Sequence, residues 1–340
     1  MIVVKEEIDL QVGKLQRFRP DENLLYRWKT KSLGYLWSFG RFILIAGISF
    51  VIIQPIIMKI SMAIKDKQDI LNRMIFIIPE NFTLDNIRHA MDILNYFPSL
   101  TNTVLYSAII MFLQAASCAL AGYGFARFDF KGKNVLFALV ILTILVPPQT
   151  LMVPMYLYFR NFDLFGILKL LTGKESINLI NTYWPSIVLS ATANGLKSGL
   201  YIYIFRQFFR GTPKEIEEAA LIDGAGGFQT FFRIMLPNAI PPLVTVMLFA
   251  FVWQYNDTYF ASLFMSQTNL LSIQIASLPA NANVYISLMY EQMPDAKADP
   301  NHVAMIVDTG ILLAIIPLII MYLFVQRYFV ESIERTGVIG

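Results

Sequence analysis

The sequence is poor in charge and in the side chains that carry most enzyme and metal chemistry. Charged residues make up 15% of its 340 residues, against about 25% in an average soluble domain. One cysteine, Cys118, excludes a disulfide scaffold and a cysteine-rich metal site. The two histidines, His89 and His302, are far apart in the sequence, and no G-x-x-x-x-G-K-[ST] phosphate loop occurs. We therefore expect no catalytic residues, no metal site and no cofactor in this chain, and no enzyme activity of its own.

What the sequence has in excess is apolar residues. Hydrophobic residues make up 56% of the chain and the mean hydropathy is +0.55, which leaves too little polar surface for a soluble protein of this length. The net charge is +3, from 27 lysines and arginines against 24 acids. That balance does not suit a polyanion-binding surface, so we expect no nucleic acid as partner. The composition predicts a membrane protein.

Windows without charge give the expected spans, since a bilayer core needs roughly 20 apolar residues as a helix. The first window, 42–58, continues to residue 64 because Lys59 can extend its amine to the interface. The window 258–290 also lacks charge but is rich in Ser, Thr, Asn and Gln, so we expect a loop with interfacial helices there. The sequence therefore predicts an all-α membrane protein with about six transmembrane helices, at 42–64, 103–126, 134–159, 182–205, 234–256 and 303–325.

Lysine and arginine counts predict the orientation of these helices. The side that would hold both termini carries 17 of these residues, the opposite side carries nine, and Lys197 lies within a span. We therefore expect a cytoplasmic N-terminal segment at 1–41, an extracytoplasmic loop at 65–102, a permease core at 103–325 and a cytoplasmic tail at 326–340. Because 41 residues precede the first apolar run, we expect that helix to be an uncleaved anchor.

The loop at 206–237, between the fourth and fifth spans, is too polar to cross the membrane and has the signals of a short helix. Thr212 is the expected N-cap, Pro213 the first helical residue, and Glu215 the partner that completes a capping box. Gly224 is expected to end this helix. On physical grounds alone, the loop is either a docking element for another protein or a connector at the surface of the bundle.

A motif within this loop favours docking. The pattern E-A-A-x3-G-x9-I-x-L-P runs from Glu218 to Pro237 with every fixed position filled. It resembles the EAA-loop signature of permease subunits of binding-protein-dependent ABC importers. Further stretches are similar to the carbohydrate branch of that family, the maltose-type and oligosaccharide-type permeases; they lie at 99–103, 120–127, 130–133, 181–184, 206–209, 255–257 and 326–330.

The resemblance implies a type I ABC importer permease fold in a bacterial inner (plasma) membrane, with both termini in the cytoplasm. It implies half of a translocation pathway for a sugar, expected to be an oligosaccharide. The implied partners are a second homologous permease, a dimer of ATPase subunits that binds ATP and Mg²⁺, and an extracytoplasmic solute-binding (lipo)protein. The residues implied to couple to the ATPase are Glu217, Glu218, Ala219, Ala220, Asp223 and Gly224. The N-terminal 41 residues and the outward stretches 165–180 and 283–302 depart from the family.

Polar and aromatic residues near or within the spans are candidates to line the pathway. An intramembrane charge usually faces a water-filled cavity or a partner, and sugars bind to aromatic faces and amides. These candidates are Asn194, Lys197, Trp253, Tyr255 and Asn256. The alternatives are an ion pair between Lys197 and Asp308, and an interfacial anchoring role for the aromatic residues. Gly122 and Gly124 could allow close helix approach.

Two other functions remain open from the sequence. The chain could serve an importer of the same design for another solute, such as a polyamine or phosphate, because such permeases share the EAA loop. A secondary transporter is the weaker alternative, since it usually needs internal repeats or intramembrane ion ligands, and it would leave the 206–237 loop without a role.

Overall fold

The computed structural model describes residues 22–72, 77–163, 175–290 and 299–337, together with Leu170 and Gly173. Within these residues every regular element is a helix, and loop residues form two isolated β-bridges. The predicted all-α class is therefore confirmed. Residues 1–21 of the N-terminal segment lie outside the described residues, as do parts of the outward stretches 165–180 and 283–302.

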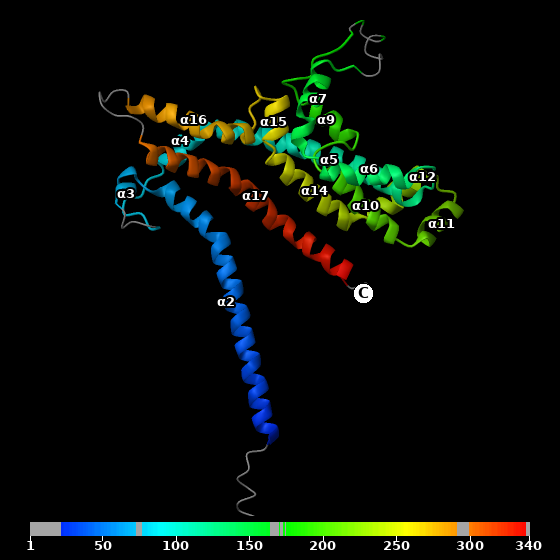
Figure 1. Ribbon diagram of the computed structural model, residues 1–340, viewed down its shortest axis with the longest axis horizontal. Helices are drawn as coiled ribbons and strands as arrows, with labels where there is room; N and C mark the ends of the chain where they lie inside the picture. Colours follow the sequence, from blue (N-terminus) through cyan, green and yellow to red (C-terminus); the bar gives the residue numbers. More distant parts are fainter. Residues whose placement is uncertain are drawn as a thin grey trace, which may run out of the picture. The chain divides into compact units, whose positions relative to one another are not determined.

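Figure 1 shows the helices in chain order. Their bounds are α2 (Glu22–Ile64), α3 (Lys67–Leu71), α4 (Asp85–Leu94), α5 (Tyr96–Arg127), α6 (Lys133–Leu145), α7 (Pro148–Arg160), α9 (Trp184–Ala191), α10 (Ser198–Gly211), α11 (Lys214–Ile222), α12 (Gly227–Thr230), the π-helix η1 (Phe231–Met235), α13 (Leu236–Asn238), α14 (Ile240–Tyr255), α15 (Tyr259–Phe264), α16 (Leu271–Tyr290) and α17 (Pro300–Gly337).

The chain divides into two units, Met1–Met58 and Lys59–Gly340. The described part of the first unit is the portion of α2 from Glu22 to Met58. The second unit holds all the other helices, and its centre is α5, which packs against α4, α9, α10, α14 and α16. Every site described below lies in this second unit.

Three described helices are long and apolar enough to cross a membrane: Gly34–Ile64, Tyr96–Arg127 and Pro300–Gln326. Two bent pairs would raise the number to five if each pair is one span, Lys133–Leu145 with Pro148–Arg160 and Gly227–Asn238 with Ile240–Tyr255. The chain is therefore a multi-pass membrane protein. The 258–290 window forms two helices, α15 and α16, and neither is among these candidate spans.

The stretch 134–159, expected to be one span, is instead two helices bent by 103°. The break falls at Pro147 and Pro148, where Val146 and Pro147 have extended backbone (ψ 120° and 133°). A proline lacks the backbone N–H and disfavours helical geometry at the preceding residue, so two in succession end α6 and start α7. The bend is thus a direct result of the sequence.

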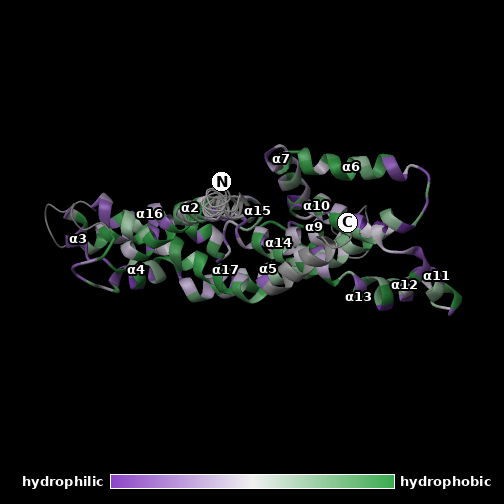
Figure 2. Cartoon of the chain, turned by 90° about the horizontal axis from the view of Figure 1, so that it is seen from below, coloured by the Kyte–Doolittle hydropathy of each residue, from purple (hydrophilic) through white to green (hydrophobic). Residues whose placement is uncertain are grey.

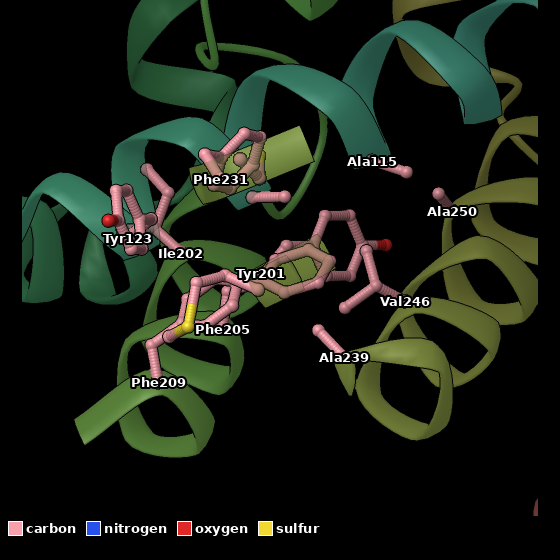
Figure 3. Close-up of a cluster of buried hydrophobic side chains, with 13 residues drawn as sticks. Ala115, Tyr123, Tyr201, Ile202, Phe205, Phe209, Phe231, Ala239, Val246 and Ala250 are labelled. Atoms are coloured by element: carbon pink, nitrogen blue, oxygen red, sulfur yellow. The ribbon is translucent and has the colours of Figure 1, made fainter. Parts of the chain in front are cut away.

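The apolar core around α5 gathers small residues and aromatic rings from α5, α10, η1 and α14 (Figure 3). Tyr123 of α5 has ring centroids of Phe209 and Phe231 at 5.4 and 5.0 Å. Gly122 lets α5 and α10 approach closely, because a Cβ there would lie 2.5 Å from the Phe205 Cβ. Gly124, the other expected contact glycine, has its nearest neighbour 3.9 Å away. Only the first of the two glycines acts as predicted.

Candidate functional site

The helix α11 carries the E-A-A residues and lies at one end of the second unit with α12, far from α3 and α4 at the other end (Figures 1 and 2). Its start differs from the expected capping box. Pro213 is the N-cap, no side chain caps the helix, and the first helical residue is Lys214. The Thr212 hydroxyl instead donates to the Phe208 carbonyl, because Thr212 ends α10. The prediction of Thr212 as N-cap was therefore wrong, because its hydroxyl bonds to the preceding helix, α10, and not to α11.

The end of α11 agrees with the prediction. Asp223 is the C-cap and is exposed, and Gly224 follows with φ +83°. A β-carbon is disfavoured in this left-handed conformation, so glycine sets the angle at which the chain leaves the helix. Nothing lies within 4 Å of a Cβ built at Gly224, so the backbone conformation, and not packing, requires glycine here.

One of the expected ATPase-facing residues, Glu217, is turned toward the subunit's own core. Its carboxylate accepts a hydrogen bond from the Tyr123 hydroxyl and lies 3.1 Å from the Arg127 Nε. Arg127 also donates from Nη2 to the Thr212 carbonyl at 2.8 Å. The side chains of Arg127 and Glu217 are 5% and 17% exposed. These contacts form a clamp, Tyr123–Glu217–Arg127, that joins α11 to the end of α5.

The outer face of α11 is formed by different residues from those that hold it. Glu218 and Ala219 are exposed, whereas Ala220 is buried at 3% exposure and packs inward. Two large apolar side chains at the tip of the loop, Ile222 and Phe228, are 85% and 79% exposed. Large exposed apolar side chains mark a protein contact where they gather into one patch. The motif did not reveal these two residues, although their hydropathy within a polar loop is a usable signal.

The fourth expected span, 182–205, is interrupted between α9 and α10. Ala193 and Lys197 have φ of 58° and 62°, so two residues other than glycine adopt left-handed backbone within the break. Two side chains of α5 bond to backbone carbonyls at the break: Gln114 donates to the Leu196 carbonyl, and Ser117 donates to the Ser190 carbonyl at 2.6 Å. Irregular backbone at membrane depth is tolerated where protein or a water-filled cavity surrounds it.

Two predicted pathway residues meet beside this break. The Lys197 Nζ lies over the Trp253 ring of α14, 4.8 Å from its centroid. Both side chains are exposed, as is Asn194, whose amide donates to the Thr192 carbonyl. The structure thus brings together a cation and an aromatic face from two elements, next to polar backbone.

The other two pathway candidates, Tyr255 and Asn256, donate hydrogen bonds to backbone carbonyls. Tyr255 is buried, and its hydroxyl donates to a backbone carbonyl of α17, so it fastens α14 to α17. Asn256 is exposed and donates to a carbonyl one turn back in α14. The next residue, Asp257, accepts from the backbone N–H groups of Tyr259 and Phe260 and so begins α15. Burial raises the pKa of Asp257 above its usual range, despite these hydrogen bonds.

Asp308 pairs with Lys59, not with Lys197 as the sequence allowed. The bond joins the last turns of α2 to α17, 249 residues apart. A pairing across that separation is set by how the helices pack and leaves no local pattern in the sequence.

Among the described residues, no group of three His, Cys, Asp or Glu side chains could hold a metal ion.

Helices of membrane length, with an exposed short helix at one end of the second unit, describe a multi-pass membrane protein with a candidate docking element. Residues 118–335 match the family described as "Binding-protein-dependent transport system inner membrane component". The match covers more than half of the chain, so the chain belongs to this family. It is a permease subunit and not an enzyme, because ATP hydrolysis in such systems is performed by separate ATPase subunits.

Several relatives are similar over nearly their full length. The chain is 29% identical to "Probable ABC transporter permease protein YurM" of Bacillus subtilis, over 94% of this chain and 95% of the relative. It is 27% identical to "Arabinooligosaccharides transport system permease protein AraQ" of Halalkalibacterium halodurans, covering 91% and 97%. A chain in the crystal structure of a bacterial ABC transporter involved in the import of the acidic polysaccharide alginate has a TM-score of 0.67 at 20% identity, covering 87% of this chain and 97% of that one. This likeness shows a shared fold.

Proposed function

We propose that this chain is one of two permease subunits of an ATP-driven carbohydrate importer and forms half of the translocation pathway. The observation that carries the proposal is the EAA helix α11, clamped to α5 on one side by Glu217 and open on the other at Glu218, Ala219 and Ile222. A helix of this kind can receive a push from a partner and pass it to the bundle.

The proposed solute is an oligosaccharide. Two relatives support this class by name, the arabinooligosaccharide permease and the "Melibiose/raffinose/stachyose import permease protein MelC" of Bacillus subtilis, which is 26% identical over 84% of this chain. The pairing of Lys197 with the half-exposed Trp253 ring supports a solute contact at the break between α9 and α10. A permease for a polyamine or phosphate is the second candidate and would import a small charged solute instead.

The proposed assembly contains a second homologous permease, two ATPase subunits and an extracytoplasmic binding protein. ATP and Mg²⁺ bind in the ATPase subunits. The ATPase dimer docks at the α11 end of the bundle, in the cytoplasm, and the binding protein docks at the α4 end. The proposed topology has six spans with both termini in the cytoplasm: α2, α5, the bent pair α6–α7, the interrupted α9–α10 stretch, α14 and α17.

The test is co-expression with the neighbouring reading frames, followed by purification through a tag on this chain. The expected result is co-purification of a second permease and an ATPase, and uptake of a labelled oligosaccharide by vesicles only when ATP and the binding protein are supplied. Uptake by this chain alone, driven by an ion gradient, would contradict the proposal. Uptake of a polyamine or phosphate in place of the sugar would select the second candidate.

A further inference from the structure

A cavity of about 420 Å³ opens near the α11 end of the bundle, outside the coupling site. It lies between the end of α5, the loop that follows, the start of α6 and one side of α10. Its lining residues come from 125–135 and from α10, so α11 takes no part in it. The lining includes three cations, Lys133, Arg206 and Arg210.

The two arginines of the cavity carry uncompensated charge. Arg206 and Arg210 stand one turn apart on α10, a spacing at which like charges repel, and neither has an ion pair within the described part of the chain. The single acid of the lining, Asp129, pairs with Lys133 at 3.2 Å. The Arg206 Nε is buried without a hydrogen-bond partner, while its guanidinium lies 3.8 Å from the Phe137 ring centroid.

A bound anion would offset the repulsion between the two guanidinium groups and give the Arg206 Nε the hydrogen-bond partner it lacks. The backbone at the start of α6 also favours a bound anion. Helix α6 begins at Lys133 beside the cavity, with Gly132 as N-cap and no capping side chain. The first N–H groups of a helix lack intrahelical partners and favour negative charge.

The rim of the cavity is apolar and continues along α6. Phe130 and Val135 line it with exposures of 44% and 66%, and Leu139, one turn further, is 51% exposed. No described residue of α6 is buried. A small soluble anion gains nothing from an apolar surface of this kind. A lipid, in contrast, places its headgroup in a basic pocket and its acyl chains along such a helix.

We propose that this cavity binds the phosphate headgroup of an anionic phospholipid of the adjoining leaflet. Arg206 and Arg210 hold the phosphodiester oxygens, the start of α6 faces them, and the acyl chains lie along Val135 and Leu139. The lipid neutralises the arginine pair and fixes the end of α10 immediately before it continues into α11. This site does not depend on which solute the importer carries.

The test is native mass spectrometry of the full chain, purified with the partners that accompany it, after addition of phosphatidylglycerol or phosphatidylcholine. The wild-type protein should retain phosphatidylglycerol in preference. The double variant Arg206→Gln/Arg210→Gln should lose about tenfold or more of that retention. Lys131→Gln is the matched control, because it removes an exposed cation in the same loop that does not line the cavity. It should behave as wild type.

Three further measurements make the proposal refutable. Arg206→Lys/Arg210→Lys keeps both charges and should keep the lipid preference, which tests the proposal even if the glutamine variant fails to fold. Inorganic phosphate should not displace the lipid; displacement at equal molar amounts would make this a soluble-anion site and overturn the assignment. Equal retention of both lipids by the wild type, or retention by the isolated chain but not by the assembled transporter, would overturn it as well. The last result would mean that a partner protein fills the cavity.

Discussion

Two lysines at or within the expected spans, Lys59 and Lys197, have partners that the sequence did not identify. The sequence predicts that each such charge needs a partner, but it does not predict which. Lys59 forms an ion pair with Asp308, and the Lys197 amine lies over the Trp253 ring. Lys197 is therefore free of any structural ion pair in the described part of the chain, which makes it the clearest residue-scale test of the pathway.

Substitution of Lys197 by Met should leave expression and assembly unchanged, because the Lys59–Asp308 pair stays intact. Transport should change about two- to fivefold in KM or in solute preference, the size of a partly exposed cation–π contact. Lys197→Arg keeps the cation over the ring and serves as control. Uptake kinetics in reconstituted vesicles decide the point; unchanged kinetics and solute preference in Lys197→Met would remove Lys197 from the pathway.

At the scale of elements, the contact between α5 and α10 depends on Gly122. Gly122→Ala would place a Cβ 2.5 Å from the Phe205 Cβ and 3.0 Å from the backbone N of Arg206, so the two helices must separate. The expected loss of stability is about 1–3 kcal/mol. Gly124→Ala is the matched control, since its nearest neighbour, Phe128 Cδ2, is 3.9 Å away. Thermal unfolding in detergent should show a lower Tm for the first variant only; equal Tm values would refute the close contact.

The clamp Tyr123–Glu217–Arg127 gives a second prediction at this scale. Glu217→Gln removes the charge that pairs with a nearly buried Arg127, at an expected cost of about 2 kcal/mol in holding α11 to α5. The outer face of α11 is unchanged, so the ATPase should still co-purify while solute-stimulated hydrolysis falls several-fold. Tyr123→Phe keeps the ion pair and should cause a smaller loss. Loss of ATPase binding in Glu217→Gln would mean that Glu217 contacts the partner directly.

The sequence predicted the types of the elements better than their boundaries and breaks. The EAA motif located α11 and its terminal glycine, because a single short pattern encodes both. The N-cap was misplaced because Thr212 bonds back into α10, a competition that a local pattern does not weigh. In the sequence, only the polar Asn194 and the adjacent Gly195 mark the interruption between α9 and α10. It depends on Gln114, some 80 residues earlier, which supplies the missing hydrogen bonds.

At the scale of the whole molecule, the charge distribution predicts which end faces the cytoplasm. Cys118 is the only cysteine and is buried, so single reporters can be introduced after Cys118→Ala. A membrane-impermeant maleimide added to intact cells should label Asn281→Cys and miss Gln229→Cys, both of which are exposed positions. The reverse pattern would invert the topology and place α11 where no cytoplasmic ATPase can reach it.

The central claim is that α11 couples this permease to an ATPase. The most direct measurement is solute-stimulated ATP hydrolysis by the reconstituted transporter carrying Glu218→Lys or Gly224→Val. Glu218→Lys reverses charge on the exposed face, and Gly224→Val forces a β-branched residue to φ +83°. Lys131→Glu reverses an exposed charge near the same end of the bundle and serves as control. We predict that both α11 variants lose ATPase binding or stimulation while the bundle stays folded and the control behaves as wild type; normal assembly and stimulation in both would show that the loop is only a connector.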